Sequence, residues 1–192
     1  RILPAVSLAC NIIVVTGGTI RYARAGAVPW RRVLPIVAVS APLATLGGLT
    51  PIRQPTFMLI LGLSLLVAGL LLTLQREAPN RPRFAGRGVP IIAGGALGYL
   101  SGLVGIGGGI FLAPLLHLIG WDRPRAVAAT ASLFILVNSF AGLAGQSTKL
   151  AATGEAGALL AYWPLAIAVL IGGQIGSMFG LKVFTELQLR RA

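Results

Sequence analysis

The sequence is poor in charge, and acidic residues are the scarcest charged type. Only 10% of the 192 residues are charged and 56% are hydrophobic, whereas soluble domains carry about 25% charged residues. Four acidic residues stand against sixteen lysines and arginines, for a formal net charge of +12. The basic residues fall between apolar runs, as membrane-flanking anchors do, and form no basic face of the kind that binds nucleic acid. The composition therefore predicts a membrane protein in a lipid bilayer, with no nucleic-acid partner.

The chain also lacks the residues that most catalytic and metal sites need. A single cysteine, Cys10, excludes a disulfide framework within the chain. A single histidine, His117, has no second metal ligand at a workable spacing. No Ser/His/Asp set and no pair of carboxylates lies in the apolar runs, so an intramembrane hydrolase would have no general base. We therefore expect no enzyme activity, no cofactor and no metal site.

Uncharged apolar runs mark six stretches of membrane-spanning character. All the acidic residues, and all the lysines and arginines, lie outside these stretches. The stretches cover residues 4–20, 33–50, 56–74, 88–120, 126–148 and 156–181. The sequence thus predicts an all-α polytopic membrane protein.

The stretch Gly88–Gly120 is the longest of the six. A continuous helix of this length would measure about 50 Å, far more than the roughly 30 Å of the hydrocarbon core. The sequence GIGGG at 105–109, followed by Pro114, indicates where the helix breaks, because glycine and proline are the poorest helix formers. Broken backbone at membrane depth is tolerated only where protein buries it or where it lines a polar cavity. This break is the first candidate for a functional site.

The basic residues of the connections favour a hairpin in this stretch. If the stretch crosses once, the two sides of the membrane carry nine and seven lysines and arginines; if it enters and returns, they carry thirteen and three. Because cytoplasmic connections are enriched in basic residues, we expect a re-entrant helical hairpin bent near 105–109. The basic loops 21–32 and 75–87 would then be cytoplasmic. One crossing with an unwound middle remains the alternative.

Matching residues in the two halves predict an internal repeat. Ala5-Val-Ser7-Leu8 resembles Thr130-Ala-Ser132-Leu133, and a glycine follows each serine ten residues later. Residues 1–75 would form a first repeat, 76–87 a cytoplasmic linker and 88–192 the second repeat. With a hairpin between them, the matched helices would run in opposite directions. The fold would then hold two pseudo-symmetric, inverted repeats with broken or re-entrant glycine-rich helices.

The triple glycine Gly107–Gly109 can present backbone N–H groups at a helix start, where unpaired donors and partial positive charge suit an anion. Close helix packing is the alternative use of small residues. Packing is the better explanation for two series with four-residue spacing, Gly94, Gly98, Gly102 and Gly172, Gly176, Gly180.

Polar side chains inside the apolar runs could complete such a site. Most hydroxyls in helices bond to an earlier carbonyl of their own helix, so we single out residues that recur in both halves or are costly to bury. The predicted substrate-binding residues are Gly105, Gly107, Gly108, Gly109, Pro114, Thr130, Ser132, Asn138, Gln174, Ser7 and Asn11.

The segment GLVGIGGGIFLAPLL at 102–116, followed by AATAS at 128–132, resembles the TauE/SafE family of sulfite-exporter-like membrane permeases. The family pattern is a GxGGGxxxxPxL stretch followed by an A-x-x-T/A-S helix, and it occurs twice per chain. Here the second copy is complete. The first begins only at Leu3, without its glycine stretch, and a last helix beyond Arg191 is absent. We therefore expect a fragment that would not transport by itself.

The resemblance implies a multi-pass permease of the cytoplasmic membrane that moves a small inorganic or organosulfur anion, such as sulfite or an organosulfonate. The alternative is a non-transporting membrane scaffold or assembly protein that holds partners on GxxxG helix faces, and such faces also leave room for a homo-oligomer. The triple glycine, the polar residues repeated in both halves and the family pattern favour the permease.

Overall fold

Every regular element in the described part of the structure is a helix. The computed structural model describes residues 2–73, 88–152 and 163–182. Their helices are α1 (Leu3–Arg24), α2 (Trp30–Leu49), α3 (Gln54–Thr73), α4 (Gly88–Val104), α5 (Gly109–Leu118), α6 (Pro124–Ala152) and α7 (Trp163–Lys182). The predicted all-α class is confirmed.

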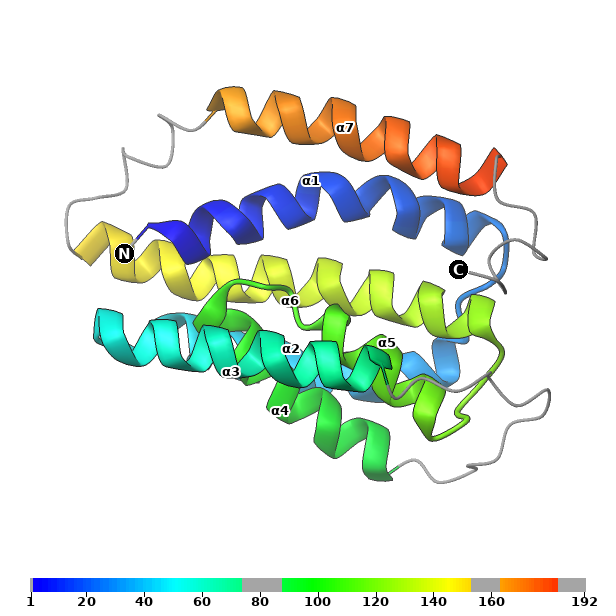
Figure 1. Ribbon diagram of the computed structural model, residues 1–192, viewed down its shortest axis with the longest axis horizontal. Coiled ribbons are helices and arrows are strands. Elements are labelled where there is room, and N and C mark those ends of the chain that lie inside the picture. The colour runs from blue at the N-terminus through cyan, green and yellow to red at the C-terminus, as the bar shows by residue number, and fades with distance from the viewer. Residues whose placement is uncertain (1, 74–87, 153–162, 183–192) are drawn as a thin grey trace.

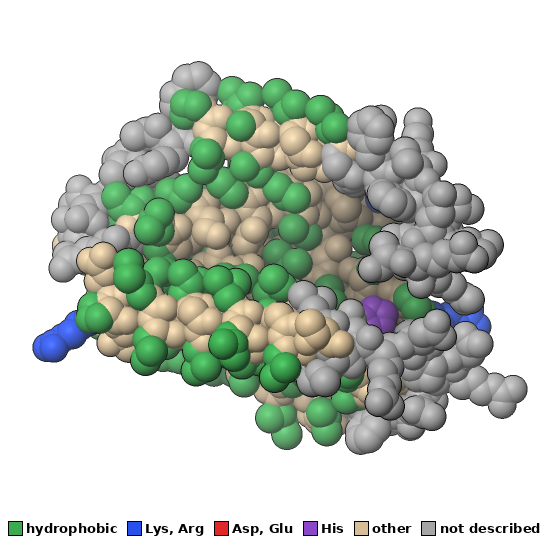
Figure 2. All heavy atoms as spheres, viewed as in Figure 1, with side chains coloured by type: hydrophobic (Ala, Val, Ile, Leu, Met, Phe, Trp, Pro, Cys, Tyr) green, Lys and Arg blue, Asp and Glu red, His purple; other side chains and the backbone are tan. Residues whose placement is uncertain are grey.

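The helices and their surface fit a lipid bilayer. In the described residues, α1, α2 and α6 are long and apolar enough to cross a membrane, and the other four helices hold shorter apolar segments. Leu59, Leu63 and Leu66 of α3 are each more than 60% exposed. On the face shown in Figure 2, hydrophobic side chains cover the middle of the bundle, and the lysines and arginines lie at its ends. Lipid tails can cover such an apolar band, which in water would be an aggregation hazard.

Helices α2 and α4 lie side by side and run in the same direction. In α4, Gly94, Gly98 and Gly102 meet in turn Ile36, Ser40 and Ala44 of α2. A Cβ at Gly98 would lie only 2.5 Å from the Ser40 carbonyl oxygen, so a larger residue would force the backbones apart. The packing interpretation of this glycine series is confirmed.

Helix α5 returns to the end of the bundle from which α4 starts (Figure 1). The side chain of Arg32, near the start of α2, forms a 3.0 Å ion pair with Asp122, which follows α5. The start of α4 lies beside the same half of α2, because Gly94 packs on Ile36. Both ends of the stretch are therefore at one end of the bundle. The chain therefore folds back as a helical hairpin, as the sequence predicts, whereas the re-entry of this hairpin into the membrane stays a prediction.

Left-handed glycines make the bend between α4 and α5. The φ angles of Gly105, Gly107 and Gly108 are 83°, 81° and 72°, a region that glycine enters without the steric penalty of other residues. At the far end of the hairpin, a Cβ at Gly105 would lie 2.6 Å from the Cα of Pro4 in α1. The chain then turns back, so that α5 begins inside the bundle.

Helix α5 stops at a glycine cap at the end where it returns. Gly120, with φ of 60°, donates its N–H to the His117 carbonyl, and Trp121 donates to the Leu116 carbonyl, each at 3.0 Å. This pair of bonds is a Schellman cap, which satisfies carbonyls that a helix end leaves open. Gly26 ends α1 in the same way.

Helix α6 packs against α1, α2, α4 and α5 and is the centre of the bundle. It runs antiparallel to α1, because Gly142 meets Leu8, while Ser139 lies at the level of Asn11. This is the orientation that an inverted repeat requires; the repeat itself and the proposed boundaries stay predictions. The linker 76–87 lies outside the described residues.

The second glycine series lies in α7. Among the described residues, no atom lies within 4 Å of a Cβ placed at Gly172 in α7, so this glycine packs on no described helix of the chain. The neighbouring Gly173 instead packs on Val14 of α1, at 3.2 Å. The contacts of Gly176 and Gly180 lie outside the described part of the structure.

Candidate binding site at the hairpin bend

Gly107 brings together polar groups from two other helices. A Cβ at this residue would lie 3.0 Å from Nδ2 of Asn11 in α1 and 3.3 Å from Oγ of Ser139 in α6. It would also lie 2.8 Å from Cγ2 of Ile135, so the glycine is needed for space as well as for its φ angle. Backbone, amide and hydroxyl therefore face one another at the bend.

The start of α5 points its open N–H groups into this region. Gly108 is the N-cap residue, and no side chain caps the helix there. The first bonds back to the helix are those from the N–H groups of Phe111 and Leu112 to the Gly108 carbonyl, both 3.2 Å long. The N–H groups before them have no partner within the helix and carry part of its positive end charge. This helix end is an electropositive hydrogen-bond donor.

Buried polar side chains near the bend have no hydrogen-bond partner among the described residues. Asn138 is fully buried with neither amide atom bonded, and the hydroxyl of Ser139 is equally buried and unbonded. Ser101 of α4 is 2% exposed, and its hydroxyl is also without a partner. An unpaired buried polar group costs about 1–3 kcal/mol. Such groups call for an explanation, and a bound ligand or water would supply one.

These side chains surround the bend from two sides. The Cβ of Ser101 would lie 3.3 Å from a Cβ at Gly108, and the ring of Phe134 would lie 2.9 Å from it. Asn138 follows Phe134 by about one helical turn and so shares its face of α6. Ser139 points to Gly107, as described. The donors of α6 and the start of α5 thus converge on the same few residues of backbone.

The electrostatic potential at the bend comes from the dipoles of the helix end and of polar groups, because the charged side chains of the described helices lie toward the helix ends. None of the seven described helices contains an aspartate or glutamate. The described helices do contain cations, but these lie toward their ends: Arg32 near the start of α2 and Lys149 near the end of α6. A small anion at the bend would therefore meet hydrogen-bond donors and a helix end, without an acidic side chain to repel it.

The structure brings some of the predicted residues together. Gly105, Gly107, Gly108 and Gly109 form the bend and the start of α5, and Asn11 reaches Gly107. A Cβ at Gly109 would clash with the side chain of Ile135, so this glycine makes room for α6. Pro114 is buried in the middle of α5, more than a turn beyond the glycines.

Other predicted residues lie apart from the bend or serve their own helix. Thr130 is fully buried, but its hydroxyl donates to the Ala126 carbonyl at 2.8 Å. Ser132 is half-buried and precedes Ser139 by about two turns. Ser7 is exposed on α1. Gln174 belongs to α7, and its side chain lies outside the described part of the structure.

Ser101 and Ser139 are not among the predicted residues, because most hydroxyls in helices bond to an earlier carbonyl of their own helix. In the structure neither hydroxyl has such a bond. The one signal that could have found Ser139 is its position directly after Asn138, in the middle of a long apolar run. Ser101 carries no comparable signal, because only the fold brings it to Gly108.

The glycine hairpin can now be compared with known proteins. The model of the family described as sulfite exporter TauE/SafE matches residues 1–192. The chain belongs to this family. The predicted resemblance is confirmed, and the glycines of the TauE/SafE pattern fall on the bend of the hairpin.

Two relatives carry the name of probable membrane transporter proteins. The protein y4hK of Sinorhizobium fredii is 31% identical over 191 residues, which cover 96% of this chain and 74% of the relative. A protein of Xylella fastidiosa is 33% identical over 96 residues, which cover 50% of this chain and 33% of that protein. No solved structure matches the chain. The TauE/SafE chain is thus a member of a membrane transporter family.

Proposed function

We propose that the protein is a permease that carries small anions of the sulfite or organosulfonate class across the cytoplasmic membrane, and that the anion binds at the hairpin bend. The observation that carries this proposal is the pair Asn138 and Ser139. Both are fully buried without a partner among the described residues, and Ser139 faces Gly107 next to the uncapped start of α5.

The donors at the bend suit a compact oxyanion. The amide of Asn11, the hydroxyl of Ser139 and the N–H groups at the start of α5 come from three helices, so they can meet different oxygens of one anion. A hydrogen bond to a charged group contributes about 1.5–3 kcal/mol, and a partly buried helix end up to about 2 kcal/mol. Binding of this size is modest, which a permease needs in order to release its cargo.

The lack of an acidic or basic side chain at the bend favours an anion of single charge. The cost of removing an ion from water grows with the square of its charge, and it is repaid in a protein interior only by close counter-charges or many hydrogen bonds. Neutral donors can compensate a sulfonate or hydrogen sulfite more readily than a sulfate dianion. We therefore expect monoanions to be preferred.

We place the basic end of the bundle in the cytoplasm. Arg21, Arg24, Arg31, Arg32, Arg123 and Arg125 all lie in or next to the α1–α2 and α5–α6 connections. The ion pair of Arg32 with Asp122 joins these two connections at one end. The positive-inside tendency then assigns this end to the cytoplasm. The loop 75–87 would lie there too, and it falls outside the described residues.

The test is the serine that faces Gly107. In the full-length protein, reconstituted into liposomes, Ser139→Ala should weaken binding of methanesulfonate or sulfite about 10- to 100-fold, which is the loss of one hydrogen bond to a charge. Its thermal stability should stay the same or rise, because the hydroxyl has no partner to lose. The matched control is Ser40→Ala on α2, where a fully buried hydroxyl already donates to the Val37 carbonyl. Equal anion affinity in Ser139→Ala and the parent would move the site elsewhere.

The scaffold alternative receives no support from the α4 glycine face. Gly94, Gly98 and Gly102 are occupied by α2 of the same chain, so this face is not free to hold a partner or a second copy. A homo-oligomer would have to use another face, and Gly172 of α7 is a small residue with open space beside it.

A further inference from the structure

A cavity of about 710 Å³ opens at the end of the bundle opposite the Arg32–Asp122 ion pair. It lies between the start of α1, the α2–α3 connection, the start of α3 and the end of α6. Its walls include Pro4, Met58, Leu103 and Leu150. This space is separate from the bend, whose glycines are not among its lining residues.

Both described cations of this end line the cavity. Arg53 directly precedes α3, and Lys149 lies in the last turns of α6. The ammonium group of Lys149 donates to the Thr50 carbonyl at 3.4 Å, which holds it on the cavity wall. No acidic residue is among the described residues that line the space. The two described basic residues at this end of the bundle, Arg53 and Lys149, therefore line the same cavity.

The floor of the cavity is also the support of the hairpin. Gln146 is 1% exposed, and its Nε2 donates at 3.0 Å to the carbonyl of Gly102 in the last turn of α4. Helix ends leave such carbonyls without an intrahelical partner. Pro4, another lining residue, packs on Gly105. The amide oxygen of Gln146 has no partner among the described residues. Two lining residues of the cavity, Gln146 and Pro4, therefore also contact the backbone at the end of α4 and at the bend.

We propose that this cavity is an anion-binding vestibule, in which Arg53 and Lys149 hold a small monoanion such as a sulfonate before it passes the floor at Gln146. The two cations and the volume of the vestibule are observed in the cavity and do not depend on the proposed function. Only the destination of the anion, the hairpin bend, rests on the proposed function.

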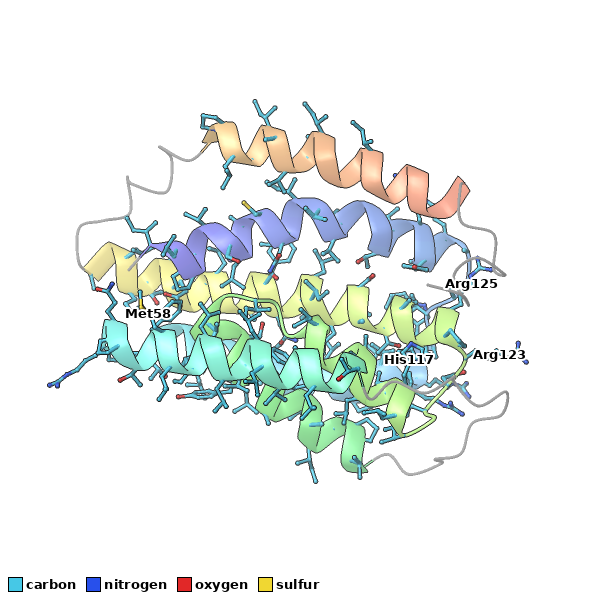
Figure 3. The ribbon with its side chains drawn as sticks, in the orientation of Figure 1. Met58, His117, Arg123 and Arg125 are labelled. Atoms are coloured by element: carbon cyan, nitrogen blue, oxygen red, sulfur yellow. The ribbon has the colours of Figure 1, made fainter. Side chains whose placement is uncertain are left out.

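The test measures the electrostatic potential of the cavity without transport. In full-length protein from which Cys10 and any other cysteine have been removed, Met58→Cys places a thiol in the wall. Met58 is 59% exposed and lies at this end of α3 (Figure 3). Two methanethiosulfonate reagents of similar size, one a sulfonate anion and one a quaternary ammonium cation, then react with it, and their rate constants are compared with those for a free thiol.

At low ionic strength the anionic reagent should be favoured about tenfold relative to the free thiol, because charged clefts raise the local concentration of counter-ions. The preference should shrink as salt is added. Lys149→Gln and Arg53→Gln should each lower it severalfold, while Arg125→Gln at the other end should leave it unchanged. Methanesulfonate should slow the reaction of both reagents, as occupation of the space requires.

The vestibule proposal would be overturned if the cysteine showed the same reagent preference as the free thiol. It would also be overturned if neither Lys149→Gln nor Arg53→Gln changed that preference. If Met58→Cys protein does not fold, the exposed cavity residue Gln54→Cys replaces it as reporter. The result is independent of the bend. If the cysteine prefers the anionic reagent but Ser139→Ala binds the anion as tightly as the parent, only the bend site is refuted. If Ser139→Ala weakens anion binding but the cysteine shows no preference for the anionic reagent, only the vestibule is refuted.

Discussion

Asn138 and Ser139 are neighbours in sequence, yet they serve different sides of the bend. Successive residues of a helix point about 100° apart. Ser139 consequently faces Gly107 and α1, whereas Asn138 shares the face of Phe134, whose ring meets Gly108. Two adjacent side chains of one helix can therefore reach around the glycine backbone. The fold carries the cost of both unpaired groups, which is reasonable only if something binds there.

Replacement of Asn138 by leucine separates stability from binding. Leucine has a similar size and no polar atoms, so Asn138→Leu should keep or raise the free energy of unfolding, by up to about 1–3 kcal/mol. Anion binding, measured by calorimetry on the full-length protein, should be lost. The control is Thr130→Val, whose hydroxyl serves its own helix, and we expect little change in affinity there. If Asn138→Leu strongly destabilised the protein but left the anion affinity at the parental value, Asn138 would have a structural role and no role in binding.

Two glycines on the hairpin should respond in opposite ways. Gly108→Val should abolish transport, because a side chain at φ of 72° is strained and would press on the Phe134 ring. Gly98→Ala should instead lower stability by about 1–3 kcal/mol, since its Cβ would strike the Ser40 backbone.

Thermal unfolding and transport by the inserted protein distinguish the two effects. Normal transport by correctly inserted Gly108→Val protein would show that the anion does not approach this backbone. A Gly98→Ala protein with weakened affinity but parental stability would show that the α4 glycine face does more than pack.

At the scale of the helix, the sequence predicts the hairpin better than it predicts its polar partners. The bend follows from three glycines and from the distribution of arginines, because both are local or additive properties. Which hydroxyls face the bend depends on helix rotation. An apolar helix that faces lipid on one side and protein on the other has no polar stripe from which rotation could be inferred.

The serines and threonines illustrate this limit. Ser132 is predicted because Ser7 matches it in the first half of the sequence, and Thr130 because it lies close by; yet Thr130 bonds to its own helix. Ser139 and Ser101 are not among the predicted residues, yet the packing of α1, α4 and α6 brings them to the glycines. Ser7, predicted on the same recurrence as Ser132, is exposed. Repetition and burial cost therefore identified the two asparagines at the bend, Asn11 and Asn138, but not its serines.

The re-entrant hairpin has a direct topological consequence. Cysteines introduced one at a time at Gly88, where α4 starts, and at Arg123, after α5, should both be labelled from one side of the membrane by an impermeant thiol reagent. Both positions are exposed, and Cys10 is replaced beforehand. A cysteine at Gln54, at the other end of α2, should be labelled only from the opposite side. Labelling of Gly88→Cys and Arg123→Cys from opposite sides would contradict the hairpin.

Over the whole molecule, charge is kept to the ends and polarity to the interior. Helix α3 exposes leucines on several sides and makes few contacts, as a lipid-facing helix does. His117 lies near the basic end of the bundle (Figure 3), ten residues from Gly107. Along a helix that separation is about 15 Å. The interior around the bend is thus polar through neutral groups, and the described helices hold no carboxylate.

This arrangement predicts how pH enters transport. Proton-coupled transporters commonly relay the proton through a carboxylate or histidine inside the membrane. The seven described helices contain none of the four acidic residues, Glu77, Asp122, Glu155 and Glu186. If transport depends on a proton, we expect the proton to travel on the substrate. Replacing each carboxylate by its amide, and His117 by glutamine, should then leave the pH profile of transport in place.

The substrate itself should set that profile. For weak acids such as hydrogen sulfite, the rate measured in liposomes should follow the protonation of the substrate and move when a weak acid of different pKa is used. For methanesulfonate, which stays ionised across the physiological range, the rate should be independent of a pH gradient. The donors at the bend are backbone, amide and hydroxyl groups, none of which titrates near neutral pH. A fixed pH optimum shared by both substrates, and shifted by any one of the five replacements, would place the proton on the protein instead.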